Sequence, residues 1–166
     1  MDLQAAADGE NLGDDESATA LLRRDHQALR KAFVHYRELM DGAAAERAGV
    51  AQGISMQLEL HFAVTREIFY PAMAQREARL VHELKHAQED IEECVTALRG
   101  APAGDSAELD STMVRLMELA DVYFCKEREL VQAAEIDPKG VEPLGARMVA
   151  RRKEIAGSVG DLESRS

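Results

Sequence analysis

The sequence has few of the residues that build disulfides, chain breaks or aromatic clusters. Among 166 residues there is no tryptophan, and there are two cysteines, four prolines, three tyrosines and four phenylalanines. Two cysteines do not make a disulfide framework. No apolar run approaches the roughly 18 residues of a membrane-spanning helix, and residues 1–20 lack the apolar core of a signal peptide. We therefore expect a cytoplasmic protein.

Basic residues are also in the minority. The chain has 31 Asp and Glu residues against 20 Lys and Arg residues, which gives a formal net charge of −11. Because nucleic acids and anionic membranes attract basic patches, we expect neither as a partner. Residues 1–16 hold six acidic residues and no basic residue, and this composition predicts a disordered acidic tail. A second, flexible tail is predicted at residues 158–166.

Strand-forming residues are thinly spread, whereas the good helix formers Ala, Leu, Glu, Arg and Met are abundant. Glycine and proline mark the breaks between segments with helical apolar spacing. Four long helices with short loops predict an all-α, up-down-up-down four-helix bundle over residues 17–157, with a short C-terminal fifth helix. The expected helices cover about residues 17–40, 45–70, 76–98, 106–135 and 143–156.

Several polar residues fall inside the apolar stripes of these helices. His61 and Thr65 lie near the centre of one stripe, Tyr123 and Glu127 near the centre of another, and His26 on the inner flank of a third. A buried carboxylate is costly unless it is paired, hydrogen-bonded or bound to metal. The residues alone leave two interpretations open: a metal site built from facing side chains, or a satisfied polar network without metal.

The remaining histidines and the two cysteines carry weaker signals. His82 and His86 have the spacing of a two-ligand pair, but both project away from the stripe of their helix, as does His35. We expect all three to face solvent. Cys94 is expected in the core and Cys125 on the outer face, and neither has an activating neighbour. The sequence contains no motif for nucleophilic catalysis or phosphate binding.

Five segments, in this order, carry a resemblance to a known family. They are Leu21-Leu-Arg-Arg-Asp-His26-Gln-Ala-Leu29, His61-Phe-Ala-Val-Thr65-Arg-Glu-Ile-Phe-Tyr-Pro71-Ala72, Val81-His-Glu-Leu-Lys85, Tyr123-Phe-Cys-Lys-Glu127-Arg-Glu-Leu130 and Leu144-Gly-Ala-Arg-Met148. Their order and spacing resemble the hemerythrin-like HHE cation-binding domain proteins of bacteria. The resemblance implies a four-helix bundle with a non-heme di-iron centre, held by histidines and glutamates.

The resemblance transfers only part of that ligand set. His26, His61 and Glu127 match ligand positions of the family. At three other ligand positions the family has one glutamate and two histidines. This chain has Thr65, Val81 and Tyr123 there instead. In an alternative alignment, His82 and His86 on the third helix would be ligands.

The matched positions imply an altered, mononuclear metal site at His26, His61 and Glu127. Tyr123 would be its fourth ligand or a hydrogen-bond partner of Glu127. Two histidines and one carboxylate suit iron with open positions, and zinc or manganese would also fit. The family resemblance implies oxygen, peroxide or nitric-oxide handling, or iron or redox sensing. Two alternatives remain: a metal-free bundle acting as a binding or regulatory module, and a small-molecule pocket around Tyr123.

Overall fold

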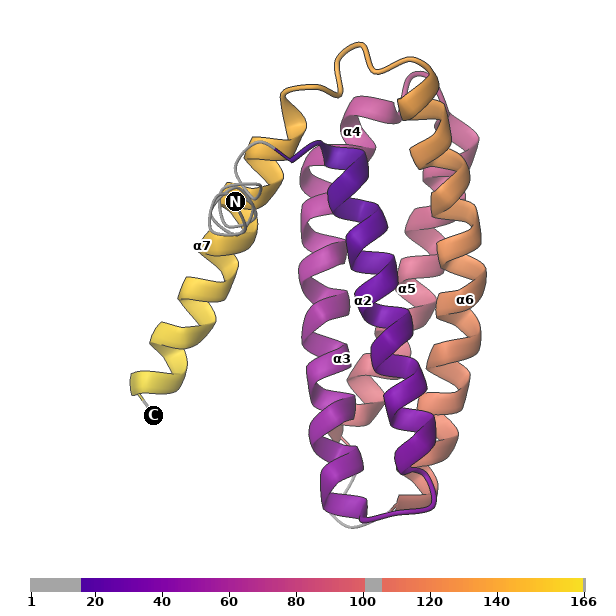
Figure 1. Ribbon diagram of the computed structural model, residues 1–166, viewed down its shortest axis with the longest axis vertical. Coiled ribbons are helices and arrows are strands. Elements are labelled where there is room, and N and C mark those ends of the chain that lie inside the picture. The colour runs from indigo at the N-terminus through magenta and orange to yellow at the C-terminus, as the bar shows by residue number, and fades with distance from the viewer. Residues whose placement is uncertain (1–15, 101–105, 166) are drawn as a thin grey trace, which may run out of the picture.

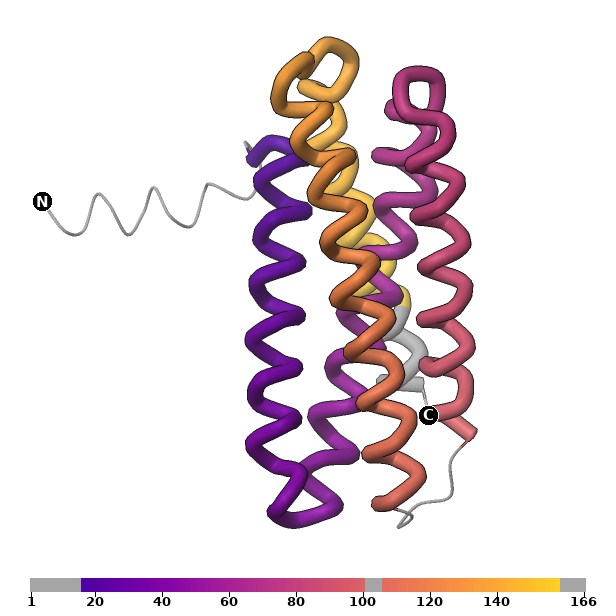
Figure 2. The backbone as a smooth tube through the Cα atoms, turned by 90° about the vertical axis from the view of Figure 1, so that its right-hand side faces the viewer, coloured from indigo at the N-terminus to yellow at the C-terminus, as the bar shows by residue number. Residues whose placement is uncertain are grey.

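Helices are the only regular secondary structure in the residues that the computed structural model describes, 16–100 and 106–165. Four long helices run alternately up and down and pack side by side (Figures 1 and 2). The predicted all-α four-helix bundle is confirmed. The bundle helices are α2 (Ala18–Leu39), α3 (Ala44–Val64), α5 (Ala78–Gly100) and α6 (Ser106–Ile136).

The end of the second bundle helix differs from the single regular helix that was predicted. A wide π-turn, η1 (Thr65–Phe69), follows α3 and leads into the short α4 (Tyr70–Met73). Pro71 has no N–H, and its ring crowds the carbonyl four residues earlier, which favours a wider turn. The Thr65 hydroxyl donates to the carbonyls of His61 (2.8 Å) and Phe62 (3.1 Å) in the preceding turn. Thr65 is buried, as its place in the apolar stripe predicts, and Tyr70 beyond the π-turn is buried as well.

The C-terminal helix is longer than predicted. Helix α7 (Leu144–Arg165) continues well past Ala156, so residues 158–165 are helical where a flexible tail was expected. It runs down the side of the bundle at an angle to it (Figure 1) and contacts α2, α3 and η1. The acidic tail predicted at residues 1–16 lies outside the described residues, except for Glu16.

Apolar side chains from all four bundle helices fill the core of the bundle. They include Phe33 of α2, Leu58 of α3, Leu84 of α5 and Phe124 of α6, each at most 1% exposed. Cys94 is buried and Cys125 exposed, as predicted. In the described part of the chain, no helix is both long enough and apolar enough to cross a bilayer.

Gly145 allows α7 to pack closely against the start of α2. A Cβ added at this position would overlap the carbonyl oxygen of Glu16 and lie 3.1 Å from the backbone nitrogen of Ala18. Gly145→Ala should therefore lower the free energy of unfolding by about 1–3 kcal/mol, the usual cost of overpacking, although alanine favours helix. Urea denaturation would measure the change.

Gly157 on the same helix provides the matched control, because a Cβ added there meets nothing within 4 Å. Gly157→Ala should leave the stability unchanged or raise it slightly. If both variants responded alike, the close approach of α7 to α2 would be refuted.

Candidate metal centre

Glu127 lies at the centre of a buried polar cluster inside the bundle. One of its carboxylate oxygens, Oε1, accepts hydrogen bonds from His26 Nε2 at 2.7 Å and from His61 Nε2 at 2.6 Å. The exposed fractions of the three residues are 0%, 5% and 1%. They are the one group of at least three His, Cys, Asp or Glu residues, among those described, whose ligand atoms lie within 4.8 Å of one another. The structure thus brings together three of the four residues predicted as ligands.

The other oxygen of Glu127, Oε2, accepts from two tyrosines. The hydroxyls of Tyr70 and Tyr123 both donate to it, and they lie 2.7 Å from each other. Gln88 of α5 completes this half of the cluster, with its side-chain nitrogen 2.8 Å from the Tyr123 hydroxyl and 3.0 Å from that of Thr65. Tyr123, the fourth predicted site residue, therefore bonds to Glu127 on the side opposite the histidines.

Gln88 is the side chain through which α5 reaches the cluster. The sequence interpretation placed Val81 at the ligand position of the third helix, whereas in the structure Gln88, seven residues and about two turns further along, contacts the cluster. Val81 is an ordinary core residue, 3% exposed. The amide oxygen of Gln88 accepts from Arg66 Nε at 2.6 Å, which fixes the amide so that its nitrogen faces the tyrosines.

A second carboxylate orients His61 from outside the cluster. Asp25 Oδ2 lies 2.8 Å from His61 Nδ1, and Arg152 of α7 holds Asp25 with two hydrogen bonds of 2.8 and 2.6 Å. Because Asp25 binds the Nδ1 side of the ring, Nε2 is directed at Glu127. This arrangement of carboxylate, histidine and inner site is the usual support of a metal-binding histidine.

The other histidines lie away from the cluster. His82 and His86 are exposed on α5, with their ring centroids 4.6 Å apart, and His35 is exposed on α2. Their predicted outward direction is confirmed. The structure does not bring the pair to the buried trio, so the alternative alignment gains no support from it.

Charged groups of opposite sign alternate through the metal-free cluster. Burial opposes ionisation of Glu127, but His61 and His26 outweigh it and hold the pKa of the carboxyl well below its ordinary value. Burial likewise opposes charge on His61, yet Glu127 and Asp25 raise its pKa to about 10. The pKa of Asp25 falls to about 2, because its bonds to His61 and Arg152 exceed the cost of burial. Two carboxylates thus face one imidazolium and one guanidinium.

These shifts predict how the stability of the metal-free protein depends on pH. The raised pKa of His61 stabilises the fold fully below pH 6.5, and this contribution is lost as the pH rises toward 10. The lowered pKa of Asp25 contributes above pH 3.8 and is lost as the pH falls toward 2. With chelator present, we expect the melting temperature to fall steadily from pH 6.5 to 9.

His61→Gln is the control for this pH dependence, because it removes the titrating group and should flatten the alkaline slope. A melting temperature that rose between pH 6.5 and 9 in the metal-free protein would show that His61 is not stabilised as an imidazolium.

The donor set suits a first-row divalent metal ion. Two imidazole nitrogens and one carboxylate oxygen, from three helices, converge in a site shielded from water, and Asp25 already holds the outer nitrogen of His61. His61 Nε2 must release its proton before it can act as a ligand, so binding should release protons and strengthen as the pH rises. Iron, zinc and manganese all accept such donors.

Comparison with known proteins gives one finding. A family model described as "Hemerythrin HHE cation binding domain" matches residues 17–134. Neither the curated proteins nor the solved structures yielded a significant match. The matched range contains α2, α3, α5, all of α6 except its last two residues, and every residue of the buried cluster, and it ends before α7.

Proposed function

The chain belongs to the hemerythrin HHE cation-binding domain family, and we propose that it binds one non-heme iron ion through His26, His61 and Glu127. The observation that carries this proposal is the convergence of the three donors, from three different helices, at a fully buried position. A carboxylate is almost never fully buried unless it is paired, hydrogen-bonded or bound to metal. Zinc and manganese remain alternatives that share the same donor preference.

The opposite half of the cluster supports a mononuclear site. Tyr70 and Tyr123 donate to Glu127 Oε2 there, Gln88 donates to both tyrosines and to Thr65, and all four are neutral groups. The pKa of each tyrosine is raised well above its ordinary value by burial and by the charge of Glu127, so neither is readily ionised. Neutral hydroxyls and an amide are poor replacements for the imidazoles and carboxylates that a second iron requires.

The surroundings of the centre suit a small, uncharged reactant. Bound iron would supply open coordination positions and redox chemistry. The chain would contribute the rest: Asp25 orients His61, the hydroxyls of Tyr70 and Tyr123 hold Glu127 Oε2, and the rings of Phe62 and Phe124 exclude water. Because every inner residue is at most 5% exposed, we propose that only molecules as small as dioxygen, peroxide or nitric oxide reach the site, in a handling or sensing role.

Nitric oxide offers a direct test of this proposal. Protein loaded anaerobically with Fe(II) should develop an electron paramagnetic resonance signal on addition of nitric oxide, and His26→Ala should lose it. The double variant His82→Ala/His86→Ala, which removes an exposed histidine pair, should keep the signal. A signal that survives His26→Ala but disappears in the double variant would place the iron on the surface of α5 and refute the proposal.

A second candidate function follows from the completeness of the hydrogen bonds. Both oxygens of Glu127 already accept from side chains, so the cluster can also exist as a satisfied polar network without metal. The protein would then be a binding or regulatory module that uses the surface of the bundle. This candidate predicts that anaerobic Fe(II) neither binds nor raises the melting temperature.

A further inference from the structure

Asp25 and Arg152 connect the buried centre to the surface through one line of contacts. The exposed fraction of the side chain falls from 31% for Arg152 to 13% for Asp25, 1% for His61 and 0% for Glu127. Each member contacts the next at 2.6–2.8 Å. The chain of contacts begins on α7, which lies outside the residues that the family model matches.

Arg152 holds the carboxylate of Asp25 in one orientation. The two guanidinium nitrogens Nη1 and Nη2 donate to the two oxygens of Asp25, which is the fork geometry that only arginine offers a carboxylate. With both oxygens held, Asp25 Oδ2 stays in place for His61 Nδ1. Without Arg152, the carboxylate is free to turn toward water, and the ring of His61 loses the bond that directs Nε2 inward.

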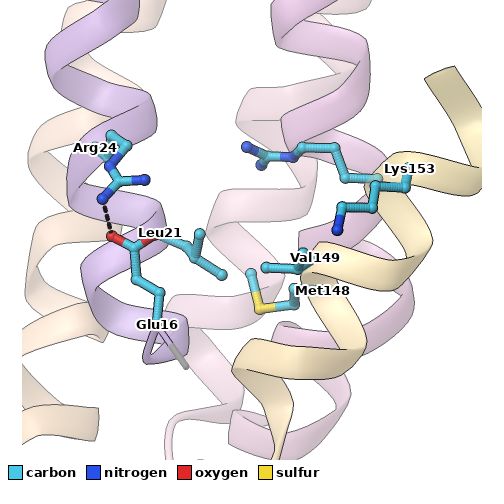
Figure 3. A pocket seen from close by; sticks show the side chains of 7 residues that line it. Glu16, Leu21, Arg24, Met148, Val149 and Lys153 are labelled. Carbon is cyan, nitrogen blue, oxygen red and sulfur yellow. Dashed lines mark ion pairs between the residues drawn. The ribbon is translucent and has the colours of Figure 1, made fainter. Parts of the chain in front are cut away.

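Helix α7 is docked against α2 with a gap beside this contact. A crevice of about 200 Å³ lies between the two helices (Figure 3), and Arg152 is one of the residues that line it. Its walls are mostly apolar, including Leu21 of α2 and Met148 and Val149 of α7. The interface is therefore not packed continuously here, and the Arg152 contact is the polar link from α7 to the metal centre.

We propose that α7 sets the metal affinity of the centre by holding Asp25, and through it His61, with Arg152. Arg152 is thus a positioning residue that contacts no ligand itself. The inference rests on the proposed function for its effect on affinity, but the hydrogen bond that it invokes exists in the metal-free protein. Any event that undocks α7 would weaken metal binding without changing a ligand.

The test compares Arg152→Gln with Arg151→Gln. Arg151 is the neighbouring residue on α7 and pairs with Glu67 on η1 and Glu154, so its loss removes an equivalent contact of the same helix that does not reach the site. Two quantities are measured. The first is the nuclear magnetic resonance signal of the His61 Nδ1 proton in chelator-treated protein, and the second is the dissociation constant for Zn²⁺, by chelator competition.

We expect Arg152→Gln to lose the slowly exchanging Nδ1 proton and to raise the zinc dissociation constant about 10-fold, at the lower end of the range for outer partners of a metal ligand. Asp25→Asn should act in the same direction, and Arg152→Lys should be intermediate, because it keeps the charge but not the fork. Arg151→Gln should keep the proton signal and the constant of the unaltered protein. If Arg152→Gln does not fold, the same two measurements are made on Arg152→Lys.

Two outcomes overturn the inference, and they can be told apart. Suppose that the unaltered protein binds zinc, and that the Arg152 and Arg151 variants keep both its zinc dissociation constant and its His61 Nδ1 proton signal. The influence of Arg152 on metal affinity is then refuted, while the proposed function stands. If the unaltered protein binds neither zinc nor anaerobic Fe(II), the proposed function and the claim on affinity fail together.

Discussion

Glu127→Ala is expected to lower the free energy of unfolding of the metal-free protein by about 3–5 kcal/mol, the usual result of removing one partner of a buried ion pair. The carboxylate accepts from four side chains, and its loss leaves His26, His61, Tyr70 and Tyr123 without their common acceptor. In a protein of this size that corresponds to a fall in melting temperature of about 10 °C. Thermal and urea denaturation in the presence of chelator would measure it.

Glu129→Ala is the matched control for this variant. Glu129 lies on the same helix and is exposed, so its removal should change the stability by less than about 0.5 kcal/mol. The stability of the Glu127→Gln protein should lie between those of the two alanine variants. Its amide keeps one acceptor oxygen, but its hydrogens face groups that are themselves donors. Equal stability of the Glu127→Ala and Glu129→Ala proteins would show that the buried carboxylate is not the hub of the cluster.

His61→Ala should raise the dissociation constant for metal by more than about 100-fold, the upper end of the range for losing an outer partner alone. The substitution removes one of three donors and also separates Asp25 from Glu127, which His61 joins. Competition between the protein and a chromophoric chelator for Zn²⁺ would measure the constant.

Exposed histidines supply the control for this second prediction. His82→Ala/His86→Ala removes two imidazoles from the surface of α5 and should leave the constant unchanged. If the double variant lost as much affinity as His61→Ala, metal bound to the protein would lie on the surface rather than in the buried cluster.

The fold and the inner trio could be predicted because both depend on helical periodicity. A carboxylate and two imidazoles lie within apolar stripes, and regular helices of 3.6 residues per turn direct such positions to a common core. The first helix was expected to begin at about residue 17, and in the structure the Ser17 hydroxyl accepts from Ala20 N at 3.2 Å as an N-cap.

Tyr70 could not be placed by the same reasoning. In a regular α-helix, Tyr70 would lie about 140° around the axis from Thr65 and face away from the site. The π-turn at Thr65–Phe69 has about one more residue per turn, and it rotates Tyr70 back toward Glu127. The signal in the sequence was Pro71, which was interpreted only as lying near a helix end.

Gln88 and Arg152 were missed for different reasons. Gln88 lies four residues after Leu84 and three before Ile91, both core residues. This spacing places Gln88 inside the apolar stripe of α5 and is the sequence signal that was overlooked. Arg152 pairs with Asp25 across 127 residues of sequence. Its contact depends on how α7 docks against the bundle, and no local pattern encodes that arrangement.

The most direct test is the metal content per chain, measured by plasma mass spectrometry on untagged protein purified without chelator or added metal. We expect about one iron ion per chain, the stoichiometry of a single two-histidine, one-carboxylate site, and its loss in His26→Ala. A content near two would contradict the mononuclear site and indicate a second set of ligands. A content near zero that anaerobic Fe(II) does not restore would contradict metal binding itself.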